Sequence, residues 1–79
     1  MSVDIKFKVN DNFEVNVSGL DSMMFGELVY NFGQMVGLKE DNKATFTFNS
    51  VIIKADSQRK LTDIGITSNS VINLKLKNL

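Results

Sequence analysis

Apolar and polar residues alternate strictly along the first segment of the chain, from Val3 to Val9. An alternation with period two is typical of a β-strand that buries one face. A second alternating segment runs from Phe13 to Val17, and the two are separated by Asn10-Asp11-Asn12. Asn and Asp tolerate left-handed turn conformations, so we expect a hairpin with its tip at residues 10–12.

The hydrophobic period changes to that of a helix after residue 19. Five apolar residues then fall on one helical face: Phe25, Leu28, Val29, Phe32 and Val36. Asp21 or Ser22 is the expected N-cap, and Gly37 is suited to end the helix. Gly26 and Gly33 each cost about 1 kcal/mol relative to Ala inside a helix. Either another segment approaches closely at these positions, or the helix is marginal.

The second half of the chain returns to strand patterns. We expect a strand at 44–48, a two-residue turn at 49–50, a short strand at 51–53 and a last strand at 71–77. Residues 61–66 are too few for a stable helix, and their apolar side chains should fill the core. The order β-β-α-β-β, plug, β predicts a single domain, residues 1–79, of two-layer α+β architecture. Its predicted core is Ile5, Phe7, Val15, Phe25, Leu28, Phe32, Phe46, Leu61, Ile66, Ile72 and Leu74.

The composition excludes several classes of function but says little about the fold. The 79 residues include nine Lys and Arg against nine Asp and Glu, and no His or Cys. Disulfides, thiolate metal sites and cysteine nucleophiles are thereby excluded, and zinc is disfavoured. A nucleophile would lack a histidine base, so we expect no enzyme and no cofactor. Balanced charge argues against nucleic acid. The longest apolar runs, such as Val51-Ile52-Ile53, are too short for a membrane span or a signal peptide, and we expect a monomer in the cytoplasm or nucleus.

Three segments resemble ubiquitin. Phe46-Thr47-Phe48-Asn49-Ser50-Val51-Ile52 is similar to its Leu-Ile-Phe-Ala-Gly-Lys-Gln. Leu61-Thr62-Asp63-Ile64-Gly65-Ile66 is similar to Leu-Ser-Asp-Tyr-Asn-Ile, and the segment from Ser70 to Lys77 to Ser-Thr-Leu-His-Leu-Val-Leu-Arg. From Val3 to Lys77 the chain therefore resembles the ubiquitin superfamily, which implies a β-grasp with a mixed five-stranded sheet and one crossover helix. The helix is closest to the small ubiquitin-like modifier group, whose Leu, Tyr, Gln, Gly and hydrophobic positions correspond to Leu28, Phe32, Gln34, Gly37 and Leu38.

The departures from the family bear on function. Conjugated members end in Gly-Gly, whereas this sequence reads Lys77-Asn78-Leu79 where the tail should start. The resemblance thus implies a non-covalent interaction module within a longer protein or, alternatively, a modifier whose tail lies beyond residue 79. The exposed isoleucine and valine of ubiquitin's apolar recognition patch correspond to Thr47 and Lys75, and the hairpin tip carries no leucine. Receptors that need this patch are not expected to bind.

The family arrangement, with first and last strands adjacent, implies one group of candidate binding residues on the exposed sheet face: Lys6, Lys8, Thr45, Thr47, Asn73, Lys75 and Lys77. This face would suit an acidic or phosphorylated protein partner, unless its lysines serve only to keep the face soluble. It has neither the Arg nor the interleaved aromatics of a nucleic-acid site.

A groove between helix and sheet edge, where the modifier group accepts an added peptide strand, is the alternative site. The corresponding residues are Asn16, Val17, Tyr30, Phe32 and Gln34. Tyr30 falls off the main helical stripe, so it is either exposed for binding or partly buried at the helix margin.

Overall fold

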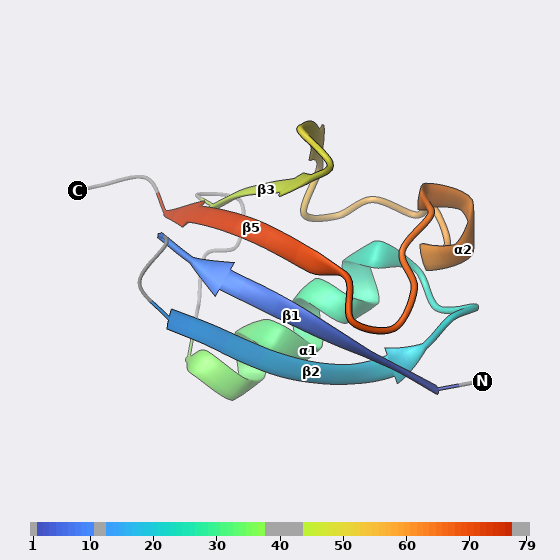
Figure 1. Ribbon diagram of the computed structural model, residues 1–79, viewed down its shortest axis with the longest axis horizontal. Helices are drawn as coiled ribbons and strands as arrows, with labels where there is room; N and C mark the ends of the chain where they lie inside the picture. Colours follow the sequence, from blue (N-terminus) through green and yellow to red (C-terminus); the bar gives the residue numbers. More distant parts are fainter. Residues whose placement is uncertain (1, 11–12, 38–43, 77–79) are drawn as a thin grey trace.

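The computed structural model describes residues 2–10, 13–37 and 44–76. Its elements, in chain order, are β1 (Ser2–Val9), β2 (Phe13–Leu20), α1 (Phe25–Val36), β3 (Ala44–Phe48), β4 (Val51–Ile53), α2 (Leu61–Ile64) and β5 (Val71–Leu76) (Figure 1). The expected order of elements is confirmed. Two boundaries and one element differ: β1 begins one residue earlier, at Ser2, β2 continues three residues beyond Val17, and residues 61–64 form a one-turn helix. Of the predicted hairpin tip, Asn10 has the expected left-handed conformation, with φ of 49°, and residues 11 and 12 lie outside the described residues.

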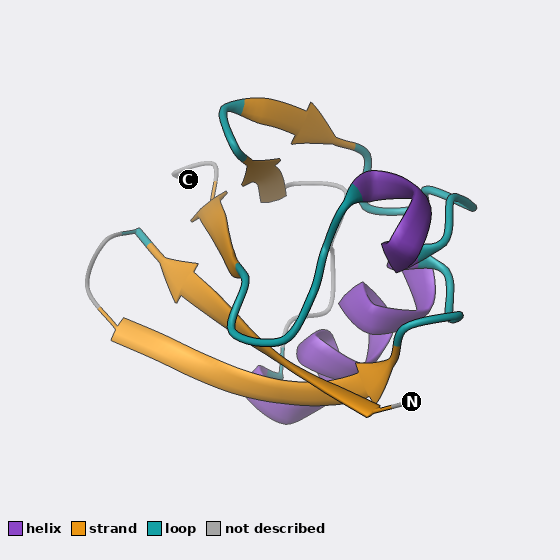
Figure 2. Ribbon diagram, turned by 45° about the vertical axis from the view of Figure 1, so that its right-hand side comes forward, coloured by secondary structure: helices purple, strands orange, loops and turns teal. Residues whose placement is uncertain are grey.

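The strands form one mixed sheet in the order β2-β1-β5-β3-β4. The central pair, β1 and β5, is parallel, with Phe7 opposite Ile72, and the other three pairs are antiparallel. The sheet curves around α1, and α2 lies near the end at which α1 begins (Figure 2). The parallel central pair brings the first and last strands together, as the family resemblance implied.

A cluster of phenylalanines forms the centre of the core between sheet and α1. Phe7 stacks on Phe32 with ring centroids 4.4 Å apart, and Phe46 meets Phe7, Phe25 and Phe32 edge to face. All four side chains are fully buried. Ten of the eleven predicted core residues are buried, and Val15 is partly buried against the same cluster. The predicted core is therefore confirmed, with Val15 at its margin.

The start of α1 differs from the sequence expectation. Its N-cap is Met24, rather than Asp21 or Ser22. Backbone carbonyls satisfy the first helical N–H groups: Phe25 donates to Arg59 at 2.8 Å, and Gly26 donates to Ser57 at 2.9 Å. Glu27 Oε1 accepts the N–H of Met24 at 3.0 Å. A side-chain N-cap is unnecessary because the segment before α2 closes the helix end.

Gly26 permits this close approach. A Cβ atom at residue 26 would lie 3.1 Å from the backbone oxygen of Ser57, tighter than an ordinary carbon–oxygen contact. At the other end of α1, Gly37 has φ +74° and its N–H donates to Gly33. The expectation of close packing is confirmed at Gly26, and Gly37 ends the helix in the left-handed conformation that glycine adopts most readily.

Candidate protein-interaction surfaces

The sheet face turned away from α1, here called the open face, carries the first candidate site. Strand register sets its residues side by side: Lys8 pairs with Asn73, and Asn73 pairs with Thr47. Thr45 pairs with Lys75 one step further along β3 and β5. The structure thus brings together Lys6, Lys8, Thr45, Thr47, Asn73 and Lys75, while Lys77 lies outside the described residues.

The charge of the open face is unevenly distributed. Glu14 on β2 lies directly opposite Lys8, and Asp4 accepts a hydrogen bond from the Ser18 hydroxyl at 2.9 Å. The β5 and β3 side carries Lys75 beside threonine and asparagine, with no carboxylate among the described residues of these two strands. An acidic group would therefore be attracted most strongly to the part of the open face over β1, β5 and β3, away from β2.

Two apolar side chains at the margins of the open face were missed in the sequence analysis. Ile52, on β4, pairs with Thr47 of β3 and is 71% exposed. Val71, at the start of β5, pairs with Lys6 and is partly exposed. The apolar patch of ubiquitin is still absent from the positions of Thr47 and Lys75. The open face is therefore polar and basic in its centre, with aliphatic contact surface at its edge.

The five residues of the alternative site, between the helix and the sheet edge, lie on different surfaces of the structure. Val17 and Phe32 are buried in the core, and Asn16 pairs with Lys6 on the open face. Tyr30, 63% exposed, and Gln34 project from α1 toward solvent. These five side chains do not line one accessible groove, because neighbouring residues of β2 point to opposite faces of the sheet.

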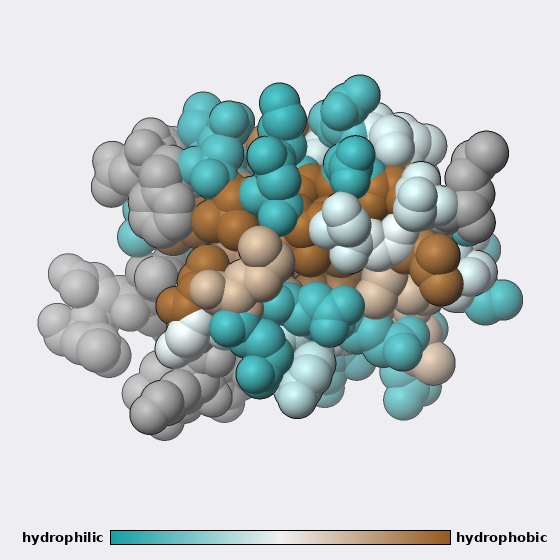
Figure 3. Space-filling view, turned by 90° about the horizontal axis from the view of Figure 1, so that it is seen from below, coloured by the Kyte–Doolittle hydropathy of each residue, from teal (hydrophilic) through white to brown (hydrophobic). Residues whose placement is uncertain are grey.

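An apolar band nevertheless follows the junction of β2 and α1. Figure 3, a view from below the orientation of Figure 1, shows hydrophobic surface running along the molecule between two rows of hydrophilic side chains. Large apolar residues exposed on α1 and at the end of β2 include Leu20, Met35 and Val36. The only charged residue of α1 is Glu27, so this band lacks the basic character of the open face.

The structure reveals a third surface between β4 and α2. A groove there is lined by Phe48, Val51, Ile53 and Ile64 among others, with Lys54 and Arg59 as its charged residues. No local sequence signal indicated it, because the exposure of Val51 and Ile52 depends on β4 being the edge strand of the sheet. Its partner in the groove, α2, was expected only as a core plug.

The part of the chain that the structure describes contains no group of three Asp or Glu residues placed to hold a metal ion. No helix in these ranges is long and apolar enough to cross a membrane.

Comparisons with known proteins agree on the fold. No protein-family description matches the chain, and no curated protein matches it in sequence. Among solved structures, the ubiquitin-like domain of the Arabidopsis thaliana protein At2g32350 superposes with a TM-score of 0.82 at 19% identity, covering 99% of this chain and 80% of that one. The UBL domain of yeast Ddi1 superposes with a TM-score of 0.82 at 12% identity, covering 99% and 92%. The chain thus has the ubiquitin-like β-grasp fold. These likenesses do not distinguish a closer relation to the small ubiquitin-like modifier group.

Proposed function

We propose that the chain is a non-covalent protein-interaction module of the ubiquitin-like type. Its open face binds an acidic or phosphorylated segment of a partner protein. The domain acts by binding alone, as a monomer in the cytoplasm or nucleus, without a cofactor and without catalysis.

The observation that carries this proposal is the grouping of Lys6, Lys8 and Lys75 around Asn73 and Thr47. Ammonium, amide and hydroxyl groups together offer hydrogen-bond donors to carboxylate or phosphate oxygens. Because these side chains are partly or fully exposed, each contact contributes little, about 0.2–1 kcal/mol. Affinity therefore depends on several contacts at once and on long-range attraction, and it falls as salt is added.

A pair of charge reversals tests the proposal. The probe is a fluorescein-labelled hexaglutamate peptide, compared with a peptide of the same length that contains two phosphoserines, with binding followed by fluorescence anisotropy. Lys75→Glu should weaken binding about three- to fivefold, because it replaces an attraction with a repulsion. Lys60→Glu is the matched control: it changes net charge equally but lies at the start of α2. Its effect should stay below about twofold.

A gain of affinity provides a second test that misfolding cannot imitate. Glu14 faces Lys8 across β1 and β2, so Glu14→Lys replaces the carboxylate opposite Lys8 with a cation and should tighten binding about two- to threefold. Equal losses for Lys75→Glu and Lys60→Glu, together with no gain for Glu14→Lys, would show that the lysines only solvate the face. Weakening by Tyr30→Ala instead would move the site to the α1 side.

A further inference from the structure

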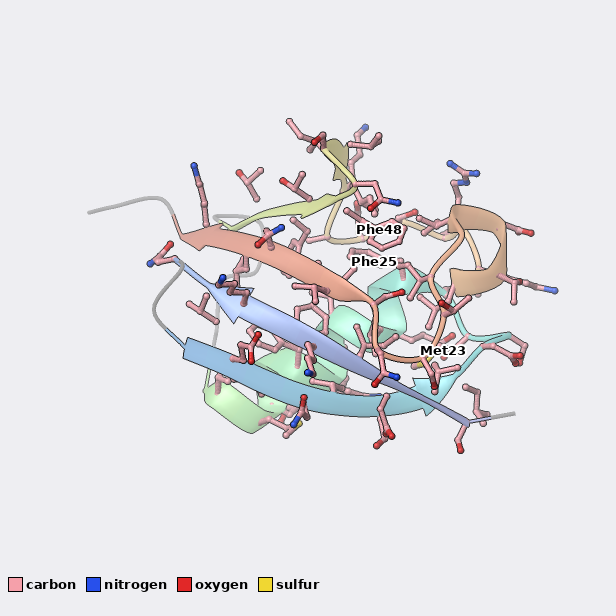
Figure 4. The ribbon with its side chains drawn as sticks, viewed as in Figure 1. Met23, Phe25 and Phe48 are labelled. Atoms are coloured by element: carbon pink, nitrogen blue, oxygen red, sulfur yellow. The ribbon has the colours of Figure 1, made fainter. Side chains whose placement is uncertain are left out.

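The groove between β4 and α2 lies on the inner side of the sheet edge, where the core no longer covers the strands. Its volume is about 460 Å³. Phe48 points inward from β3 in Figure 4, and Ile53 and Ile64 are partly buried against the core, so the floor of the groove is apolar. Val51, at the outer wall, is 63% exposed. An exposed aliphatic side chain beside an apolar floor leaves room for one more apolar side chain.

The edge strand also presents backbone groups to this region. Asn49 and Ser50, with φ of 52° and 67°, form the two-residue turn between β3 and β4. A turn of this kind is closed by a hydrogen-bonded pair, here Phe48 and Val51, and the next pair along the ladder, Thr47 and Ile52, is then not hydrogen-bonded. The N–H and C=O groups of Ile52 therefore point away from β3, toward a segment that could lie alongside β4.

The charge of the groove has one sign. Its lining includes Lys54 and Arg59 and contains neither Asp nor Glu. Arg59 is positioned over α2, because its Nη2 donates to the backbone oxygen of Asp63 at 3.1 Å. Within the described part of the chain, no salt bridge neutralises either cation. The apolar floor and the two cations without a salt-bridge partner together favour a ligand that carries both apolar and negatively charged groups.

We propose that this groove is a second docking site, separate from the open face, for a partner-protein segment that combines a leucine-like apolar side chain with flanking carboxylates. The apolar side chain packs between Val51 and Ile64, and the carboxylates lie near Lys54 and Arg59. The backbone of Ile52 adds main-chain hydrogen bonds. Because the charged residues of the groove are Lys54 and Arg59, charge complementarity favours an acidic segment over a basic or a neutral one.

Nuclear magnetic resonance titration of the ¹⁵N-labelled domain tests this site. The probe is Ac-Asp-Asp-Leu-Leu-Asp-Asp-NH₂, and two control peptides replace either its aspartates with lysine or its leucines with serine. The aspartate–leucine peptide should give saturable shifts at Val51, Lys54, Arg59 and Ile64. The serine peptide should bind at least fivefold more weakly, and the lysine peptide should give no saturable shift at these residues.

Matched variants separate this groove from the open face. Lys54→Glu should weaken binding of the aspartate–leucine peptide at least fivefold, whereas Lys75→Glu on the open face should change it less than twofold. Val51→Ser should weaken binding at least threefold, whereas Leu20→Ser, at another exposed apolar position, should have no effect.

Three results would overturn the proposal: shifts centred on Asn73 and Lys75, equal losses for the two charge reversals, or no saturation up to 5 mM peptide. The first of these would leave the open-face function standing. Saturable shifts at the groove residues, together with no binding of hexaglutamate, would instead support the groove proposal and contradict the proposed function of the open face.

Discussion

Replacing Phe46 with alanine is the most demanding test of the described packing. This side chain is fully buried, and its ring contacts three others, with centroids 6.1 Å from Phe7, 5.8 Å from Phe25 and 6.4 Å from Phe32. It extends from β3 into the space between the sheet and α1. The substitution therefore removes both buried area and the edge-to-face contacts.

The expected loss is a large part of the domain's stability. A buried Phe→Ala change costs about 3–5 kcal/mol. At about 0.05–0.15 kcal/mol per residue, a domain of this length has a total free energy of unfolding of about 4–12 kcal/mol. The variant should thus be near the limit of folding at 25 °C. Tyr30→Ala also removes an aromatic ring, but from a site exposed to solvent, and should cost less than about 0.5 kcal/mol.

Urea denaturation followed by far-ultraviolet circular dichroism measures both variants, and it suits a chain without tryptophan. With a slope of about 1 kcal/mol per molar urea, Phe46→Ala should lower the midpoint by about 3 M or abolish the folded baseline. Phe46→Leu, which leaves a smaller void, should give a measurable intermediate midpoint if the alanine variant does not fold. A Phe46→Ala midpoint within about 0.5 M of the unmodified domain, or an equal loss for Tyr30→Ala, would refute the described core.

Three further outcomes are expected. Gly26→Ala should destabilise the domain by about 1 kcal/mol or more, although Ala favours helix by about 1 kcal/mol, because the new Cβ would press against the Ser57 carbonyl; a more stable variant in thermal melts would contradict this. Gly65→Ala should cost about 1–2 kcal/mol, because φ is +92° there, and an unchanged melting temperature would show that the turn adjusts. Incubation of the 79-residue chain with ATP and a cell extract should give no thiol-sensitive thioester adduct, because this 79-residue chain carries no C-terminal Gly-Gly and Leu79 is bulky, and an adduct would favour the modifier alternative.

Much of the fold follows from local pattern. Alternation in β1 and β3 and the 3.6-residue period of α1 identify the faces that meet in the core, and each buried phenylalanine falls on such a face. The parallel pairing of β1 with β5 follows from the family resemblance, since no local pattern specifies which distant strands pair. The resemblance thereby also placed Lys8, Asn73 and Thr47 side by side.

The features that could not be predicted from the sequence depend on contacts between distant segments. Asp21 and Ser22 have good capping side chains, yet the carbonyls of residues 57 and 59 satisfy the helix start, and no local signal reveals such a contact. The residues of the alternative helix–strand site are separated for a different reason: Asn16 and Val17 are sequence neighbours but point to opposite faces of β2. Exposure of Val51 and Ile52 depends on β4 being the sheet edge, which follows only from the strand order.

The central claim, that acidic segments bind the open face, is tested most directly by chemical-shift mapping of the ¹⁵N-labelled domain. Hexaglutamate, its phosphoserine counterpart and an apolar ubiquitin-binding helix are titrated separately at low and at physiological salt. We predict saturable shifts centred on Lys6, Lys8, Thr47 and Lys75 with the acidic peptides, weaker at higher salt, and no saturable binding of the helix. Saturable binding of the helix at the same residues, or acidic-peptide shifts that avoid them, would contradict the claim.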